Sequence, residues 1–161
     1  MMNIEPQAEH KWLQRLVGEW TMEGEANMGP DQPAHKMTGQ ESVQSVGGLW
    51  ALGEGRGESP DGKPALTFMT LGYDPVQKRF VGTFIGSMMT HMWIYNGTLD
   101  EAGKVLTLDT GGPDFSGAPG MVNYQDIIEF VDDDHRILKA QLQDKDGKWC
   151  QFMTAHYHRK K

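Results

Sequence analysis

The sequence predicts an all-β protein: an antiparallel meander β-barrel of about ten strands, with one short N-terminal helix that caps an end. Apolar and polar residues alternate along most of the chain, as they do in strands with one buried face. Short segments rich in Gly, Pro and Asp interrupt the alternation, at intervals too short for the helices that connect parallel strands. A closed barrel is favoured because closure removes the exposed edges of an open ten-stranded sheet.

The predicted helix covers about residues 7–17. Pro6 suits the first turn of a helix, and Gly18 is placed to end it. Its apolar residues fall mainly on one helical stripe: Ala8, Trp12, Leu13, Leu16 and Val17. We therefore expect this helix to pack across one end of the barrel, with Trp20 near the barrel floor beneath it.

The clearest strand runs from Trp20 to Met28, where every second residue is apolar or small. The residues from Gly111 to Gly120 form the longest stretch without predicted structure; they are interpreted either as a disordered surface loop or as a flap over the barrel mouth, tipped by Phe115. Further strands are predicted at Lys36–Val46, Leu49–Glu58, Ala65–Tyr73, Arg79–Met88, His91–Leu99, Lys104–Thr110, Val122–Val131, Arg136–Gln143 and Lys148–His158.

Size and charge restrict the class of protein. The chain has 161 residues and a formal net charge of −7, which predicts a single domain over residues 1–161 and argues against a nucleic-acid partner. No apolar run is long enough for a transmembrane helix, and the first residues lack the features of a signal peptide. The single cysteine, Cys150, is typical of the reducing cytoplasm. We expect a soluble cytoplasmic protein without a membrane partner.

Five segments resemble one bacterial family, catalogued as domain of unknown function 1579. They are His10–Trp20, Gly47-Gly48, Leu71–Pro75, Gly82–Met88 and Ala155–Lys160, and together they extend over nearly the whole chain. The resemblance implies a lipocalin-like (calycin) barrel, in which a short helix precedes a Gly-x-Trp first strand. It implies no activity, and this chain has Gly86 where the family tends to have an acidic residue.

The interior of such a barrel is the predicted site, and a binding module for a small apolar ligand is the favoured function. The chain contains eleven methionines, whose flexible side chains suit a cavity that accepts varied apolar ligands, but equally a filled core. An interaction scaffold with a filled barrel and no ligand therefore remains an alternative function. The predicted cavity lining comprises Trp20, Met22, Phe68, Phe84, His91, Trp93, Tyr124, Met153 and Tyr157.

The alternative is a haem- or metal-dependent enzyme. His91 shares strand parity with Trp93 and is the candidate haem ligand. His156 and His158 lie on one face of a strand, as metal ligands do, but that face is predicted to meet solvent. We expect no metal and no cofactor, and the absence of a nucleophile motif around Cys150 or a serine disfavours covalent catalysis.

Three carboxylates interrupt strands whose pattern is otherwise compatible with a core: Glu41, Asp109 and Asp126. An inward carboxylate is a functional candidate, but each is expected to point outward. Glycines occupy every second position of Gly53–Gly57 and leave one strand face bare, which either lets the strand bend or lets a ligand approach it closely.

Self-association into a homodimer is the last expectation. Ile85, Phe152 and Ile127 have the opposite strand parity to Phe84, Met153 and Tyr124. If the latter three point inward, the former three lie on the outer surface. Adjacent strands can assemble such apolar side chains into an interface patch.

Overall fold

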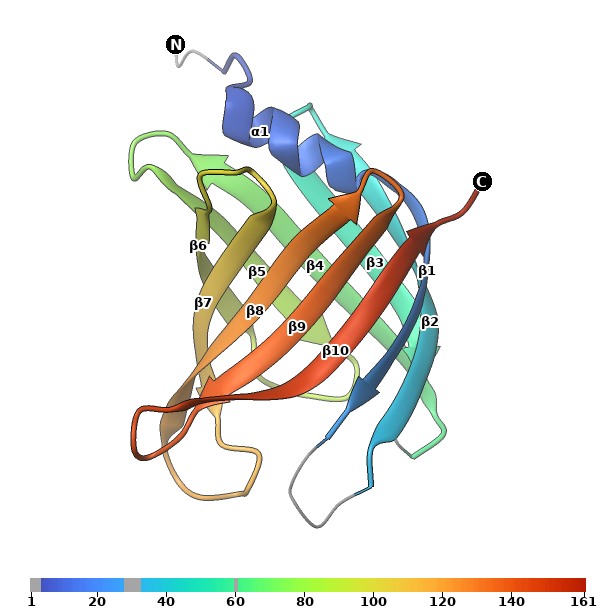
Figure 1. Ribbon diagram of the computed structural model, residues 1–161, viewed down its shortest axis with the longest axis vertical. Helices are drawn as coiled ribbons and strands as arrows, with labels where there is room; N and C mark the ends of the chain where they lie inside the picture. Colours follow the sequence, from blue (N-terminus) through green and yellow to red (C-terminus); the bar gives the residue numbers. More distant parts are fainter. Residues whose placement is uncertain (1–3, 28–32, 60) are drawn as a thin grey trace.

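Ten strands follow one another around a closed barrel (Figure 1). The computed structural model describes residues 4–27, 33–59 and 61–161. Every strand pairs antiparallel with its neighbours in the chain, and the first closes the barrel by pairing with the last, from Trp20↔Arg159 to Ala26↔Met153. The strands are β1 (Gly18–Ala26), β2 (His35–Val46), β3 (Trp50–Glu58), β4 (Pro64–Asp74), β5 (Arg79–Gly86), β6 (Trp93–Leu99), β7 (Val105–Pro113), β8 (Met121–Asp132), β9 (His135–Gln143) and β10 (Trp149–Arg159). The predicted fold class is confirmed.

The strand bounds differ from the predicted ones mainly in β7. This strand continues through Gly111 and Gly112 to Pro113, because these residues pair with Asn123, Val122 and Met121 of β8. The predicted ten-residue loop therefore shortens to residues 114–120. Met28, the predicted end of the first strand, lies outside the described residues.

The helix α1 (Ala8–Leu13) and the following 3₁₀ turn η1 (Gln14–Leu16) lie across one end of the barrel (Figure 1). Trp12 packs edge-on against Phe80 and Phe130, and its Nε1 donates a hydrogen bond of 2.7 Å to the carbonyl oxygen of Gly103. These contacts confirm the expected position of the helix. None of the helices in the described ranges is long and apolar enough to cross a lipid bilayer.

The floor of the barrel is built around Trp20. This side chain is completely buried, and its Nε1 donates a hydrogen bond of 2.8 Å to the Leu16 carbonyl oxygen, as expected for a residue beneath the helix. The Arg159 guanidinium lies 4.3 Å from the Trp20 ring and donates to the carbonyl oxygens of Val17 and Arg15. Gly18 has a φ of 137°, and a Cβ there would lie 2.3 Å from Arg159 Nη1. The end of β10 is thereby attached to the start of β1.

Candidate functional site

The barrel encloses a cavity of about 340 Å³. Leu16 and Arg136 border it near the floor, and Met88 and Phe115, both partly exposed to solvent, border it at the other end. Its volume equals that of about eleven water molecules and lies near the lower limit for ligand pockets, roughly 300 Å³. The interior therefore has room for a small organic molecule.

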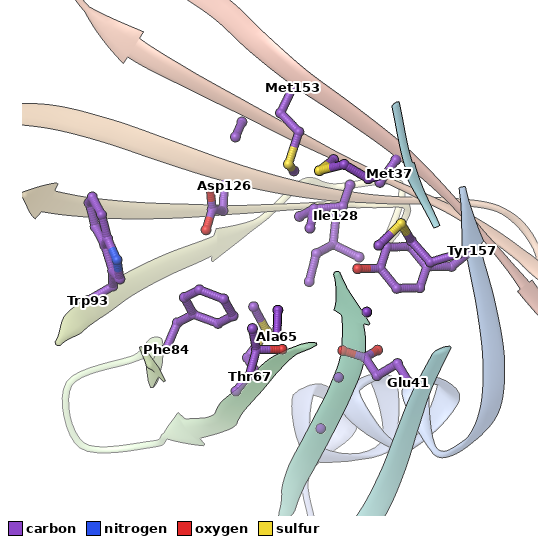
Figure 2. A pocket seen from close by; sticks show the side chains of 18 of the residues that line it. Met37, Glu41, Ala65, Thr67, Phe84, Trp93, Asp126, Ile128, Met153 and Tyr157 are labelled. Carbon is purple, nitrogen blue, oxygen red and sulfur yellow. The ribbon is translucent and has the colours of Figure 1, made fainter. Parts of the chain in front are cut away.

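The cavity wall is largely apolar and rich in flexible and aromatic side chains (Figure 2). Thioether side chains adapt to ligands of irregular shape, and aromatic rings offer large flat contact surfaces. The methionines of the wall are Met22, Met37, Met69, Met88, Met89 and Met153, and its aromatic residues are Phe84, Trp93, Phe115, Tyr124, Phe152 and Tyr157.

Most of the sequence-predicted lining residues border this cavity, and Phe68 does not. Thr67 and Met69, its neighbours on β4, border the cavity, so the alternation of the strand puts Phe68 on the opposite face. The predicted inward position of Phe68 is therefore wrong. The predicted residues at the cavity are Met22, Phe84, Trp93, Tyr124, Met153 and Tyr157.

Trp20 and His91 also lie outside the cavity wall. Trp20 lies below the cavity, with the guanidinium of Arg136 at 4.6 Å from its ring. His91 precedes β6; its Nε2 is 2.8 Å from the carbonyl oxygen of Gly111, and its ring packs edge-on against Trp93. No histidine borders the cavity within the described ranges, so the residues present do not fit a haem site with His91 as the ligand, the alternative considered from the sequence. In the same ranges, no group of three His, Cys, Asp or Glu side chains is arranged to hold a metal ion.

Phe152 and Phe115 both border the mouth of the cavity, which corrects the outward position expected for Phe152. The register of β10 shifts between Gln151 and Met153, so Phe152 and Met153 both border the cavity although they are consecutive. Phe115, in the loop after β7, packs edge-on against Tyr124 and Phe152 with ring centroids 5.3 and 5.4 Å away. The loop thus contributes an apolar side chain to the mouth, as the flap interpretation expects.

Two of the three candidate carboxylates point inward, which corrects the expectation for Glu41 and Asp126. Asp126 lies between Tyr124 and Ile128, two inward residues of β8, so strand parity was the available signal. Asp109 is exposed, as expected, and accepts a hydrogen bond from Gln125 on the outer surface.

Asp126 is a carboxyl group in apolar surroundings. Burial raises its pKa to about 6, although a 2.5 Å hydrogen bond donated by the Tyr95 hydroxyl acts in the opposite direction. Burial and the nearby Asp126 charge raise the pKa of Tyr95 well above its ordinary value, so Tyr95 remains the donor. Asp126 therefore changes protonation state close to neutral pH.

Arg136 is a buried cation, 4% exposed. Its Nη2 donates to Glu41 Oε1 across the cavity floor, and its guanidinium lies between the rings of Trp20 and Tyr157, 4.0 Å from the latter. Glu41 is its only hydrogen-bond partner within the described ranges, and its buried Nε has none. The guanidinium is thus charge-compensated but poor in hydrogen bonds.

The Tyr157 hydroxyl points into the cavity (Figure 2). It has no hydrogen-bond partner within the described ranges, whereas the hydroxyl of Tyr124 donates to the Pro113 carbonyl oxygen. Burial, with a further contribution from the negative charge of Glu41, raises the pKa of Tyr157 above its ordinary value. Its proton therefore stays in place at neutral pH. The Thr110 hydroxyl, also in the wall, is buried without a partner among the described residues.

Comparison with known sequences decides the family. The family described as "Protein of unknown function (DUF1579)" matches residues 5–159. The chain belongs to this family. No functionally curated protein matches the sequence. The match covers both the floor residues and the mouth residues, so the cavity lies entirely within the family's domain.

Solved structures similar to this DUF1579 protein are barrel proteins of low sequence identity. Rv2717c from M. tuberculosis has 16% identity and a TM-score of 0.67, covering 98% of this chain and all of that one. The S-type phycobiliprotein lyase CPES from Guillardia theta has 15% identity and a TM-score of 0.62, covering 96% and 94% of the two chains. EF1p2_mFAP2b, solved bound to DFHBI, has 14% identity and a TM-score of 0.50, covering 94% and 98%. At these identities the similarity shows the fold alone.

Proposed function

We propose that the protein binds a small, largely apolar molecule inside the barrel. The observation that carries this proposal is the unfilled cavity of about 340 Å³, whose wall is rich in methionine and aromatic side chains. The alternative, a filled barrel that acts as a scaffold, would leave no such space in its interior. The neighbour solved bound to DFHBI supports the proposal at the level of the fold.

The residues proposed to contact the ligand are those that the sequence predicts to line the barrel interior and that also border the cavity. The Gly53–Gly57 strand also belongs to this wall and offers bare backbone to a ligand. The proposed contact residues are Met22, Phe84, Trp93, Tyr124, Met153 and Tyr157.

We also propose that the fold belongs to the lipocalin-like (calycin) superfamily. The single free cysteine, Cys150, supports a cytoplasmic location.

Binding is tested by filling the cavity. Thr67 points into it from β4, close enough to the bare strand that a Cβ on Gly55 would lie 2.4 Å from Thr67 Oγ1 (Figure 2). The variant Thr67→Trp is expected to weaken the binding of an apolar fluorescent dye at least ten-fold, because the indole occupies the ligand's space. Phe68→Trp, the next residue on the opposite face, is the matched control and should bind as the wild type does.

Native mass spectrometry of the purified wild type complements the dye titration, since it reports any ligand retained from the cell. A wild type that shows neither a retained ligand nor dye binding would contradict the proposal and favour the scaffold. Equal dye affinity of the two variants would place the dye outside the barrel.

We propose, as a second candidate, an acid–base enzyme on the same cavity. The observation in its favour is Asp126, whose pKa of about 6 suits proton transfer near neutral pH. A bound ligand that exchanges hydrogen for deuterium in heavy water supports the enzyme if Asp126→Asn abolishes the exchange. A ligand recovered without exchange leaves binding as the function.

We also propose that the outer surface of β4–β6 contacts a second copy of the chain. The outer apolar patch, as we define it, comprises Phe68, Ile85, Met92 and Ile94; Ile85 lies opposite Phe68 in the sheet register, and Ile94 lies opposite Thr83. Met92 and Ile94 are 53% and 67% exposed. A contiguous apolar surface of this kind is typical of interfaces.

A further inference from the structure

The cavity floor holds hydrogen-bond donors that have no partner among the described residues. We define the floor cluster as Glu41, Arg136 and Tyr157, which come from three different strands, β2, β9 and β10. A guanidinium carries five N–H donors, and Glu41 is the only partner that Arg136 has within the described ranges. The Tyr157 hydroxyl adds a further donor that faces the cavity without a partner among the described residues.

Such unpaired donors are unfavourable in an apolar cavity, and a ligand can satisfy them. Leaving a buried polar group without a partner disfavours the empty state, so an acceptor at the floor gains more than it would in water. Tyr157 keeps its proton because burial raises its pKa, and it therefore acts as a donor at neutral pH.

The charges around the cavity determine what kind of acceptor fits. The charged side chains that border it within the described ranges are Glu41, Arg56, Glu58, Asp126 and Arg136, three acidic and two basic. Arg136 is already paired with Glu41, and Arg56 is paired with Glu54. A ligand carboxylate would find no unpaired cation and would lie near Glu41, so burying it is disfavoured. A ligand ammonium at the floor would lie beside the Arg136 cation and the donor hydroxyl of Tyr157, and it would offer neither of them an acceptor.

We infer that the ligand presents a neutral carbonyl oxygen, as in a ketone, ester or amide, to Tyr157 and Arg136 at the floor, and points its apolar part toward the mouth. This inference rests on the proposed function, because it assigns an orientation and a chemical class to the molecule held in that cavity. The mouth agrees with it, since Met88, Phe115 and Phe152 offer apolar contacts there.

The inference is tested with three probes of one chain length: octane, the corresponding methyl ketone, and octanoate. Their dissociation constants are measured by displacement of the apolar dye from the full-length protein. The ketone is expected to bind at least ten-fold more tightly than octanoate. The infrared carbonyl stretch of the bound ketone is expected at a lower frequency than in hexane, because the oxygen accepts a hydrogen bond.

Two variants identify the donor. Tyr157→Phe removes only the free hydroxyl and should weaken the ketone about three- to ten-fold, leave octane unchanged, and shift the carbonyl stretch back toward its value in hexane. Tyr73→Phe is the matched control, because Tyr73 on β4 lies outside the cavity wall. This variant should bind both probes as the wild type does.

The outcomes separate the inference from the proposed function. The inference is overturned if octane and the ketone both bind and the carbonyl stretch of the bound ketone is the same as in hexane. It is also overturned if Tyr157→Phe weakens the binding of octane and of the ketone equally. Either result leaves the apolar binding site intact. Octanoate that binds more tightly than the ketone overturns it in favour of an anionic ligand. If none of the three probes, nor the dye, binds the wild type, the proposed function fails as well.

Discussion

Asp126 makes the stability of the fold depend on pH. Its pKa is raised from 3.8 to about 6 by burial, so the folded state binds a proton that the unfolded state has already released between these values. Stability is therefore lost as the pH rises from about 4 to about 6, by up to about 3 kcal/mol. In Asp126→Asn this loss is absent, and the amide oxygen can still accept the Tyr95 hydrogen bond.

We expect the stability of Asp126→Asn, relative to the wild type, to increase between pH 4 and pH 7, as measured by urea unfolding at several pH values. Asp109→Asn, on the outer face of β7, is the control and should show no comparable trend. A constant difference between Asp126→Asn and the wild type across this range would show that the carboxyl group is not buried as described.

The helix α1 is the element that closes the barrel end, and Trp12 is its main contact. The ring packs against Phe80 and Phe130, and Nε1 donates to Gly103, a residue far along the chain. Trp12→Ala is expected to lower the free energy of unfolding by about 3–5 kcal/mol, the range for a large buried aromatic residue. Lys11→Ala, exposed on the same helix, should change it by less than about 0.5 kcal/mol.

Denaturant unfolding with the two variants measures this contribution directly. If Trp12→Ala and Lys11→Ala have the same free energy of unfolding, the packing of α1 against the barrel does not stabilise the fold. The dye titration on Trp12→Ala adds a second readout, because a loosened floor should weaken binding in a fully folded protein.

At the scale of the whole molecule, the outer apolar patch predicts a homodimer. Light scattering of the wild type at micromolar concentration is expected to give a mass near twice 18.0 kDa. Ile85→Lys places a charge in the patch and should convert the dimer to a monomer without unfolding it. Val76→Lys, at an equally apolar but remote and highly exposed position, should remain dimeric. A monomeric wild type would contradict the prediction.

The strand order and the number of strands follow from local patterns in the chain. Alternation of apolar and polar residues, as in residues 20–26, specifies extended backbone, and turn residues such as those around Asp100 and Asp144 separate neighbouring strands. Short connections restrict neighbours to antiparallel pairing. The N-terminal helix and the Trp20 floor were predictable for the same reason, since capping and periodicity are properties of a few consecutive residues.

Only the tertiary structure decided which face of each strand points inward and whether the interior is filled. A one-residue difference in register reverses the faces, as at Phe68, and the irregularity in β10 brings Phe152 to the same side as Met153. The floor cluster depends on a pair 95 positions apart, Glu41 and Arg136, which no local pattern connects. The cavity itself depends on how side chains from all ten strands pack, because an unfilled volume is a property of the closed barrel and of no single segment.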